Sequence, residues 1–241
     1  MSRIFLVAVL VVVVVAGCST TVQGNPIGQL ARDESVRSVV RALPDLAELS
    51  SVMGVAMRTG EGGVVGGSDL RDLDDDDSAG ECLGVKRTGA RRAYLAADIR
   101  DAVENHWETV NARPHFDVNV AVVELDSVDD AQASYARIGA QWRQCRGKTV
   151  YSMNPTGTER LWAYEFTRVD ESNGMLTAVD MESMANGTTQ STPAQRALTV
   201  VSDYLIDVDV YSMSWRTGDP IVTDNAVAVA HLIASKINSS L

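Results

Sequence analysis

Five stretches of alternating apolar and polar residues constrain the fold more than any other feature of this 241-residue chain. Such alternation predicts β-strands that turn one face to the core. The stretches cover residues 116–122, 162–166, 175–184, 196–201 and 204–211. No helical pattern separates the last four, so strands that follow one another are expected to pair antiparallel. We therefore predict an α+β fold in which helices flank a mostly antiparallel sheet.

The last two stretches predict a hairpin that turns at Ser202 and Asp203. In its second strand, Ile206 and the two valines that follow at alternate positions are expected to face the core. Asp207 and Asp209 alternate with them and are expected to face solvent.

Residues 128–145 predict the clearest helix, because their apolar side chains recur at steps of three and four. Ser127 is a favourable N-cap, and the register turns Cys145 towards the core. Two further helices are predicted over residues 44–53 and 224–237, the first of them ended by Gly54.

The start of the chain predicts a secretion signal. An apolar run from Ile4 to Ala16 follows Arg3, and it is too short to span a bilayer. The tetrad that ends at Cys18, Val-Ala-Gly-Cys, resembles a bacterial lipobox. We predict cleavage of residues 1–17 as a signal peptide and lipidation of the Cys18 thiol. The alternatives are a short membrane anchor or an ordinary secretion signal.

A lipidated Cys18 implies a protein held at the outer face of the cytoplasmic membrane, in the cell envelope. Residues 18–33 are mostly small and polar, and they are expected to form the lipidated N-terminus and a flexible tether. Residues 34–241 are then expected to form a single domain. The acyl chains, palmitate among them, would be its contact with the membrane.

The other two cysteines, Cys82 and Cys145, form an even pair in an exported chain. An oxidising compartment favours a disulfide between them, with two buried free thiols as the alternative. This assignment leaves no cysteine for nucleophilic catalysis.

The chain is acidic, with 32 Asp and Glu against 21 Lys and Arg. This balance excludes a nucleic-acid partner, since binding to phosphates needs clustered basic residues. Six Asp residues lie within residues 69–77 and predict a solvated loop. Their spacing does not match an EF-hand, so only loose cation binding is an alternative there.

Motifs for chemistry are missing from the sequence. No Gly-x-Ser-x-Gly nucleophile elbow is present. None of the three histidines, His106, His115 and His231, lies at a metal-ligand spacing from another His, Cys or carboxylate residue. We therefore predict no catalytic residue, no metal ion and no cofactor.

Three tryptophans are candidates for a ligand-binding cleft. Trp162 lies on an aromatic strand face, whereas Trp107 and Trp215 lie in segments of weak periodicity and are suited to line a cleft. Packing in the core is the alternative for each of them.

The order of several short motifs resembles the PknH-like extracellular sensor domain family of mycobacteria. The motifs are Glu81-Cys82-Leu83-Gly84, Val122 to Leu125, Trp142-x-x-Cys145, Gln195-Arg196-Ala197-Leu198, Ile206-Asp207-Val208 and Asn225-Ala226-Val227. The resemblance covers residues 43–237. Family members often have a second disulfide, but Ala194 and Tyr211 stand at its two positions in this chain.

The resemblance implies an α+β sensor-like domain that binds an extracellular ligand in a cleft and is not an enzyme. Its expected partners are the membrane, through the lipid anchor, an unidentified small-molecule or envelope ligand, and a signalling protein. The first alternative is an envelope hydrolase whose catalytic residues are dispersed along the chain. The second is a lipoprotein with a structural or surface-interaction role.

Overall fold

The computed structural model describes residues 34–60, 65–67, 70, 80–111, 115–154, 156–212 and 224–240. The expectations for Cys18, the signal peptide, the tether, Trp215 and nearly all of the Asp-rich segment therefore lie outside the described residues. Within them, no helix is both long and apolar enough to cross a membrane.

One sheet of nine strands organises the described part of the chain, in the order β1-β3-β4-β9-β8-β7-β6-β5, with β2 also paired to β3. Every pairing is antiparallel. The strands are β1 (Met57–Thr59), β2 (Val65–Gly67), β3 (Ile99–Thr109), β4 (Phe116–Leu125), β5 (Thr149–Met153), β6 (Arg160–Ser172), β7 (Met175–Met184), β8 (Thr192–Val201) and β9 (Tyr204–Ser212). The α+β class with an antiparallel sheet is confirmed.

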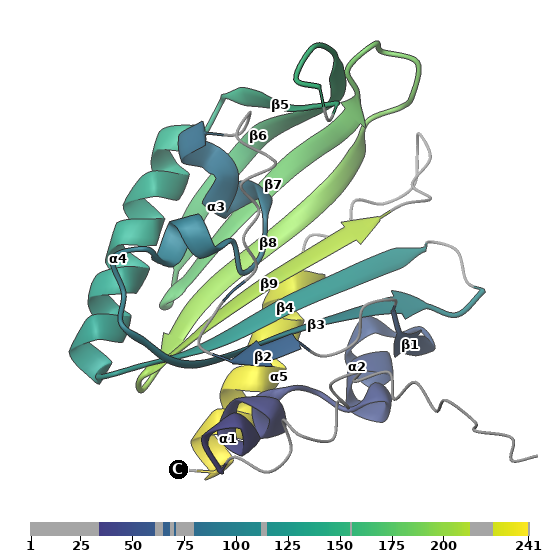
Figure 1. Cartoon of the computed structure of the whole chain (residues 1–241). Coiled ribbons are helices and arrows are strands. Elements are labelled where there is room, and N and C mark those ends of the chain that lie inside the picture. Colours follow the sequence, from purple (N-terminus) through teal and green to yellow (C-terminus); the bar gives the residue numbers. More distant parts are fainter. Residues whose placement is uncertain are drawn as a thin grey trace, which may run out of the picture.

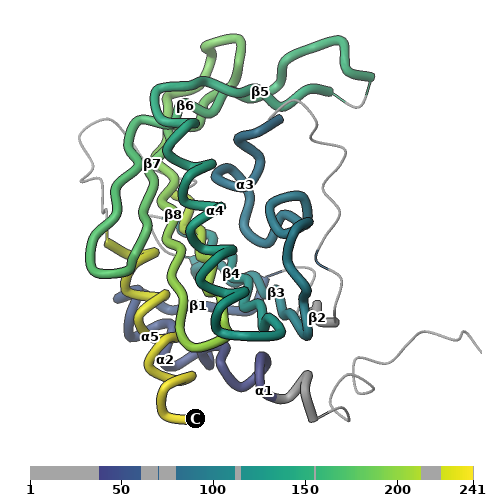
Figure 2. Tube along the Cα trace, turned by 90° about the vertical axis from the view of Figure 1, so that its left-hand side faces the viewer, coloured from purple at the N-terminus to yellow at the C-terminus, as the bar shows by residue number. Residues whose placement is uncertain are grey.

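Helices pack on both faces of this sheet. Figure 1 shows α4 (Val128–Cys145) and α3 (Leu83–Lys86) in front of the strands, with the 3₁₀ helix η3 (Arg91–Tyr94) beside α3. Figure 2 shows the other helices, α1 (Glu34–Ala42), α2 (Leu46–Met53) and α5 (Asn225–Ser240), on the opposite side. We call the side that carries α3 and α4 the α4 face and the other side the α5 face.

Aliphatic and aromatic side chains fill the α5 face. The valines of β4 and β9 meet α5 there, together with Trp107 of β3, which is 2% exposed. Local signals mark both ends of the short helix α2, and Gly54 ends it as expected. The Asp45 side chain accepts a hydrogen bond from the backbone N–H of Glu48, and Gly54 takes the left-handed conformation (φ 66°) that favours glycine.

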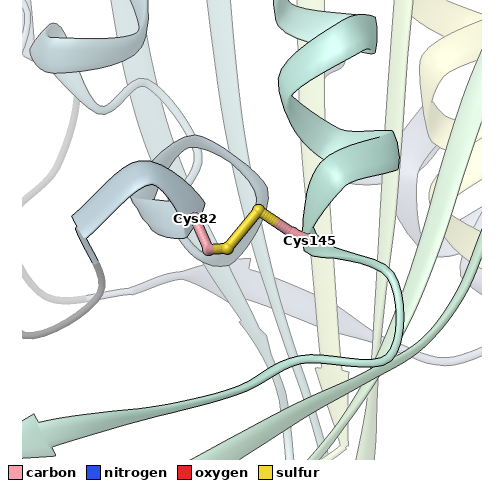
Figure 3. The surroundings of a disulfide bond; sticks show 2 residues. All are labelled: Cys82 and Cys145. Carbon is pink, nitrogen blue, oxygen red and sulfur yellow. A yellow bond between two sulfur atoms is a disulfide. The ribbon is translucent and has the colours of Figure 1, made fainter.

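On the α4 face, helix α4 packs on the sheet and a disulfide links its C-terminal end to the segment before α3. Ser127 caps α4 by accepting a hydrogen bond from the backbone N–H of Asp130 at 3.1 Å, as the sequence predicts. Trp142 and Cys145 lie at its buried end, 0% exposed. Cys145 forms a disulfide with Cys82, just before α3, with 5.7 Å between the Cα atoms (Figure 3). The predicted pairing of these cysteines is confirmed.

Two expectations need correction. The hairpin at Ser202 is confirmed, but Asp207 in β9 is only 3% exposed and does not face solvent. Asp209 likewise faces the protein, because α3 and the segment after it cover that side of the strand. The second correction concerns the segment around Trp107, for which the weak periodicity predicts no strand. This segment forms the long strand β3. The two positions of the second family disulfide, Ala194 and Tyr211, are direct cross-strand partners.

Candidate functional site

A row of charged and polar side chains crosses the centre of the sheet on the α4 face. The antiparallel register places Glu182 and Asp180 of β7, Arg196 of β8 and Asp207 and Asp209 of β9 on the same side. The row continues through Asn119 of β4 to His106 of β3, since the register pairs Asp209 with Asn119 and Asn119 with His106. Unpaired charges are costly to bury, so this concentration at the centre of a sheet needs an explanation.

Arg196 and Asp207 form the fixed centre of the row. The Arg196 Nη2 atom lies 2.5 Å from Asp207 Oδ1, and both side chains are almost fully buried. Arg196 also donates to the backbone carbonyl of Val85 at 2.6 Å, and its guanidinium stacks over Trp142. Asp207 Oδ2 accepts from the hydroxyl of Tyr94 at 3.2 Å. These contacts tie α3, η3, α4 and the sheet together, which indicates a structural role for this pair.

Three carboxyl groups beside this pair hold their protons unusually tightly. Burial raises the pKa of Glu182 to about 8, and the charge of Asp209 adds to the effect. Burial also raises the pKa of Asp209 to about 6, although Arg196 and Arg87 act in the opposite direction. Asp180 has a pKa well above its usual range, again mainly because of burial. Buried carboxyl groups with such pKa shifts occur preferentially at functional sites.

Cations from α3 and the residue after it face these carboxyl groups. Lys86 is 5% exposed, and its ammonium group lies 4.1 Å from the centre of the Tyr164 ring. Lys86 and Arg87 both lower the pKa of Glu182 against the effect of burial. The site therefore combines acidic groups on the strands with cations on the segment that covers them.

A small hollow of about 100 Å³ opens between this segment and the sheet. Arg87, Glu104, His106, Asn119 and Asp209 contribute to its lining. Pockets that enclose a drug-sized molecule measure roughly 300–1,000 Å³. The hollow can therefore admit one functional group of a ligand, with the remainder outside it.

Neither Trp107 nor Trp162, two of the tryptophans predicted to line a cleft, contributes to the lining of this hollow. Trp107 is buried in the core of the α5 face, so the expectation for it is corrected in favour of core packing. Trp162, at the start of β6, is 36% exposed and projects from the same face of the sheet as Glu182. Its role in binding stays a prediction.

The sequence offers no metal-ligand spacing for the histidines, but the fold brings two of them close to carboxylates. His106 and His115 both lie close to carboxylates of neighbouring strands, at 3.4 and 3.7 Å from Asp117 Oδ1. Sequence reasoning missed this cluster because the residues come from two strands, of which β3 was not predicted. His231 is exposed on α5 and is not part of the cluster.

Comparison with known proteins identifies the family. The sequence matches the PknH-like extracellular domain over residues 35–236. The chain belongs to this family. Over 121 residues, half of its length, it is 31% identical to the serine/threonine-protein kinase PknH of Mycobacterium tuberculosis and 30% identical to that of Mycobacterium bovis. Those matches span 17% and 18% of the kinases, so the chain is similar to only a small part of them.

A solved structure supports the same fold. The extracellular domain of PknH from Mycobacterium tuberculosis aligns with a TM-score of 0.65 and 23% sequence identity. The alignment covers 84% of this chain and 96% of that domain. The fold of that domain is therefore present over nearly its whole length.

Proposed function

We propose that this protein is a cell-envelope lipoprotein whose sensor-like domain binds a small polar ligand at the buried carboxyl groups of the α4 face. The observation that carries the proposal is the group formed by Asp180, Glu182 and Asp209. Burial raises the pKa of all three, and the charge of Asp209 adds to the effect on Asp180 and Glu182. Asp209 also lines a hollow that is open to solvent. The family membership supports an extracellular location.

The chemistry of the hollow indicates what kind of ligand group it would accept. Asp209 lines the hollow and, when ionised, accepts hydrogen bonds. Glu182 lies outside the lining of the hollow; with a pKa of about 8 it keeps a proton at neutral pH and can donate a hydrogen bond to the part of the ligand that extends from the hollow. Arg87 adds a cation at the rim. Such a set suits a ligand end that carries both donors and acceptors, such as an amine or hydroxyl beside a carbonyl.

We further propose that the domain is not an enzyme and that lipidation at Cys18 holds it at the membrane. The Arg196–Asp207 pair is saturated by structural contacts, which leaves it without a free nucleophile or base. Any signal across the membrane would then require a partner protein.

Native mass spectrometry of protein purified from its own host tests the binding proposal. A retained small molecule is expected in the parent protein and is expected to be lost in the double variant Glu182→Gln/Asp209→Asn. The control is Glu165→Gln, which removes an exposed carboxylate of β6. A parent protein that is consistently empty, or a ligand retained equally in the double variant, would contradict the proposal.

Turnover assays on ester, peptide and glycan probes separate this proposal from the hydrolase alternative. We expect no turnover above that of a protein-free blank, and turnover by both the parent and the double variant would favour the hydrolase.

A further inference from the structure

We infer that Glu108, His115 and Asp117 form a binding site for a divalent transition-metal ion, with zinc as the ion that suits them best. One ligand atom from each residue lies within 4.8 Å of those of the other two. The inference does not rest on the proposed ligand site, since none of its three ligands lines the hollow there; only the supporting His106 is shared.

The sheet register brings the three side chains together. Glu108 of β3 and Asp117 of β4 are direct cross-strand partners. The side chains that alternate with them, Trp107 and Phe116, are 2% and 7% exposed in the core of the α5 face. This anchoring turns Glu108 and Asp117 outward together, and His115 lies immediately before β4. Ligands on packed strands are held more rigidly than ligands on loops.

The distances are close to those of a metal site. His115 Nε2 lies 3.8 Å from Glu108 Oε2 and 3.7 Å from Asp117 Oδ1. Tetrahedral zinc with bonds of about 2.1 Å places its ligand atoms roughly 3.4 Å apart. The two His115 distances would therefore shorten by a few tenths of an ångström on zinc binding, and the Glu108 and Asp117 oxygens would close from a separation of at most 4.8 Å. The three side chains are between 17% and 29% exposed, so an ion from solution can reach them.

The donor set favours a transition metal over calcium or magnesium. Ca²⁺ and Mg²⁺ prefer sites made only of oxygen ligands, whereas an imidazole nitrogen suits zinc and its neighbours. Two carboxylates and one neutral imidazole would largely balance the charge of the ion. Three protein ligands also leave a fourth position for water or another group.

Two further side chains support the cluster from outside it. His106 Nε2 lies 3.4 Å from Asp117 Oδ1, so this ring can orient the carboxylate. The His106 ring packs so closely on Gly60 that a Cβ atom there would lie 2.2 Å from Nδ1. On the other side, the Arg58 Nη2 atom lies 2.7 Å from Glu108 Oε1, which leaves the Oε2 atom directed to His115.

Titration of the tag-free protein with Zn²⁺ by isothermal calorimetry tests the site. Excess Mg²⁺ and Ca²⁺ in the buffer would occupy weak oxygen-only sites elsewhere on this acidic chain. One Zn²⁺ is expected to bind per chain. The affinity is expected to fall by at least about 100-fold in His115→Ala and in Asp117→Asn, and by about 10- to 100-fold in His106→Ala. His231→Ala, which removes an exposed histidine from α5, is the matched control and should bind like the parent.

Long-range ¹H–¹⁵N spectra of the imidazole rings give a second readout that needs no variant. Zn²⁺ is expected to shift the Nε2 resonance of His115 and to leave that of His231 unchanged. Absence of binding, unchanged affinity in His115→Ala, or a shift confined to His231 would each overturn the assignment.

Discussion

Replacing Glu182 by Gln tests the electrostatic reasoning behind the candidate site. The pKa of Glu182 is raised from 4.5 to about 8, chiefly by burial and then by the charge of Asp209. The folded protein therefore keeps a proton that the unfolded chain releases above pH 4.5. This group makes the free energy of unfolding fall as the pH rises from about 4.5 to about 8, by up to about 1.4 kcal/mol per pH unit.

The size of the effect follows from the shift itself. The rise in the pKa of Glu182 from 4.5 to about 8 corresponds to a loss of at most about 5 kcal/mol in the free energy of unfolding once Glu182 is fully ionised in the folded state. A glutamine has nearly the same shape and no charge at any pH. The variant is therefore expected to match the parent near pH 4 and to exceed its free energy of unfolding by about 3–5 kcal/mol at pH 9.

Urea unfolding of both proteins at a series of pH values measures this difference directly. Glu165→Gln serves as the control, because its carboxylate is exposed on β6 and the profile should follow that of the parent. A difference between parent and Glu182→Gln that stays constant from pH 4 to pH 9 would refute the reasoning.

Three further predictions concern the framework and the anchor. Arg196→Met leaves Asp207 buried without its partner and is expected to lower the free energy of unfolding by about 3–5 kcal/mol in urea titrations; a loss below about 1 kcal/mol would contradict the role given to this pair. Replacing Cys82 and Cys145 together by serine is expected to remove about 4 kcal/mol, since the bridge closes a loop with a sequence separation of 63 residues; stability equal to that of the parent would show that the bridge is dispensable. Cys18→Ala is expected to abolish lipidation and release the protein from the membrane fraction, and continued retention of the variant would count against the lipobox assignment.

The elements with a strong single period could be predicted from the sequence. The helix at residues 128–145, the strand at residues 175–184 and the hairpin at Ser202 all lie where the pattern places them. In the helix one face packs on apolar core and the other is exposed, so its period records burial directly. In the strands the alternation predicts the element, but not which faces the rest of the chain covers.

The strand β3 could not be predicted, because both of its faces carry polar side chains. Asp101, Glu104 and Asn105 are all buried there, and a register shift near Asp101 interrupts the alternation. Without β3, the partners of His115 and Asp117 could not be seen.

The burial of Asp207 and Asp209 could not be predicted for a related reason. Alternation in β9 predicts one solvated face, yet α3 and the segment after it cover that face, and Arg196 of the neighbouring strand β8 pairs with Asp207 beneath them. The covering residues that contact Asp207, Gly89 and Tyr94, lie 118 and 113 residues before it in sequence, so only the tertiary structure shows that these aspartates belong to the interior.

Mapping by nuclear magnetic resonance tests the central claim, binding at the carboxyl groups of the α4 face, most directly. The ¹⁵N-labelled protein would be titrated with small-molecule extract from the envelope of its own host. The account predicts backbone shifts concentrated around Glu104, Asn119, Glu182 and Asp209, which are absent in Glu182→Gln/Asp209→Asn. Shifts confined to α5 and the face beneath it, or no shifts at all, would contradict it.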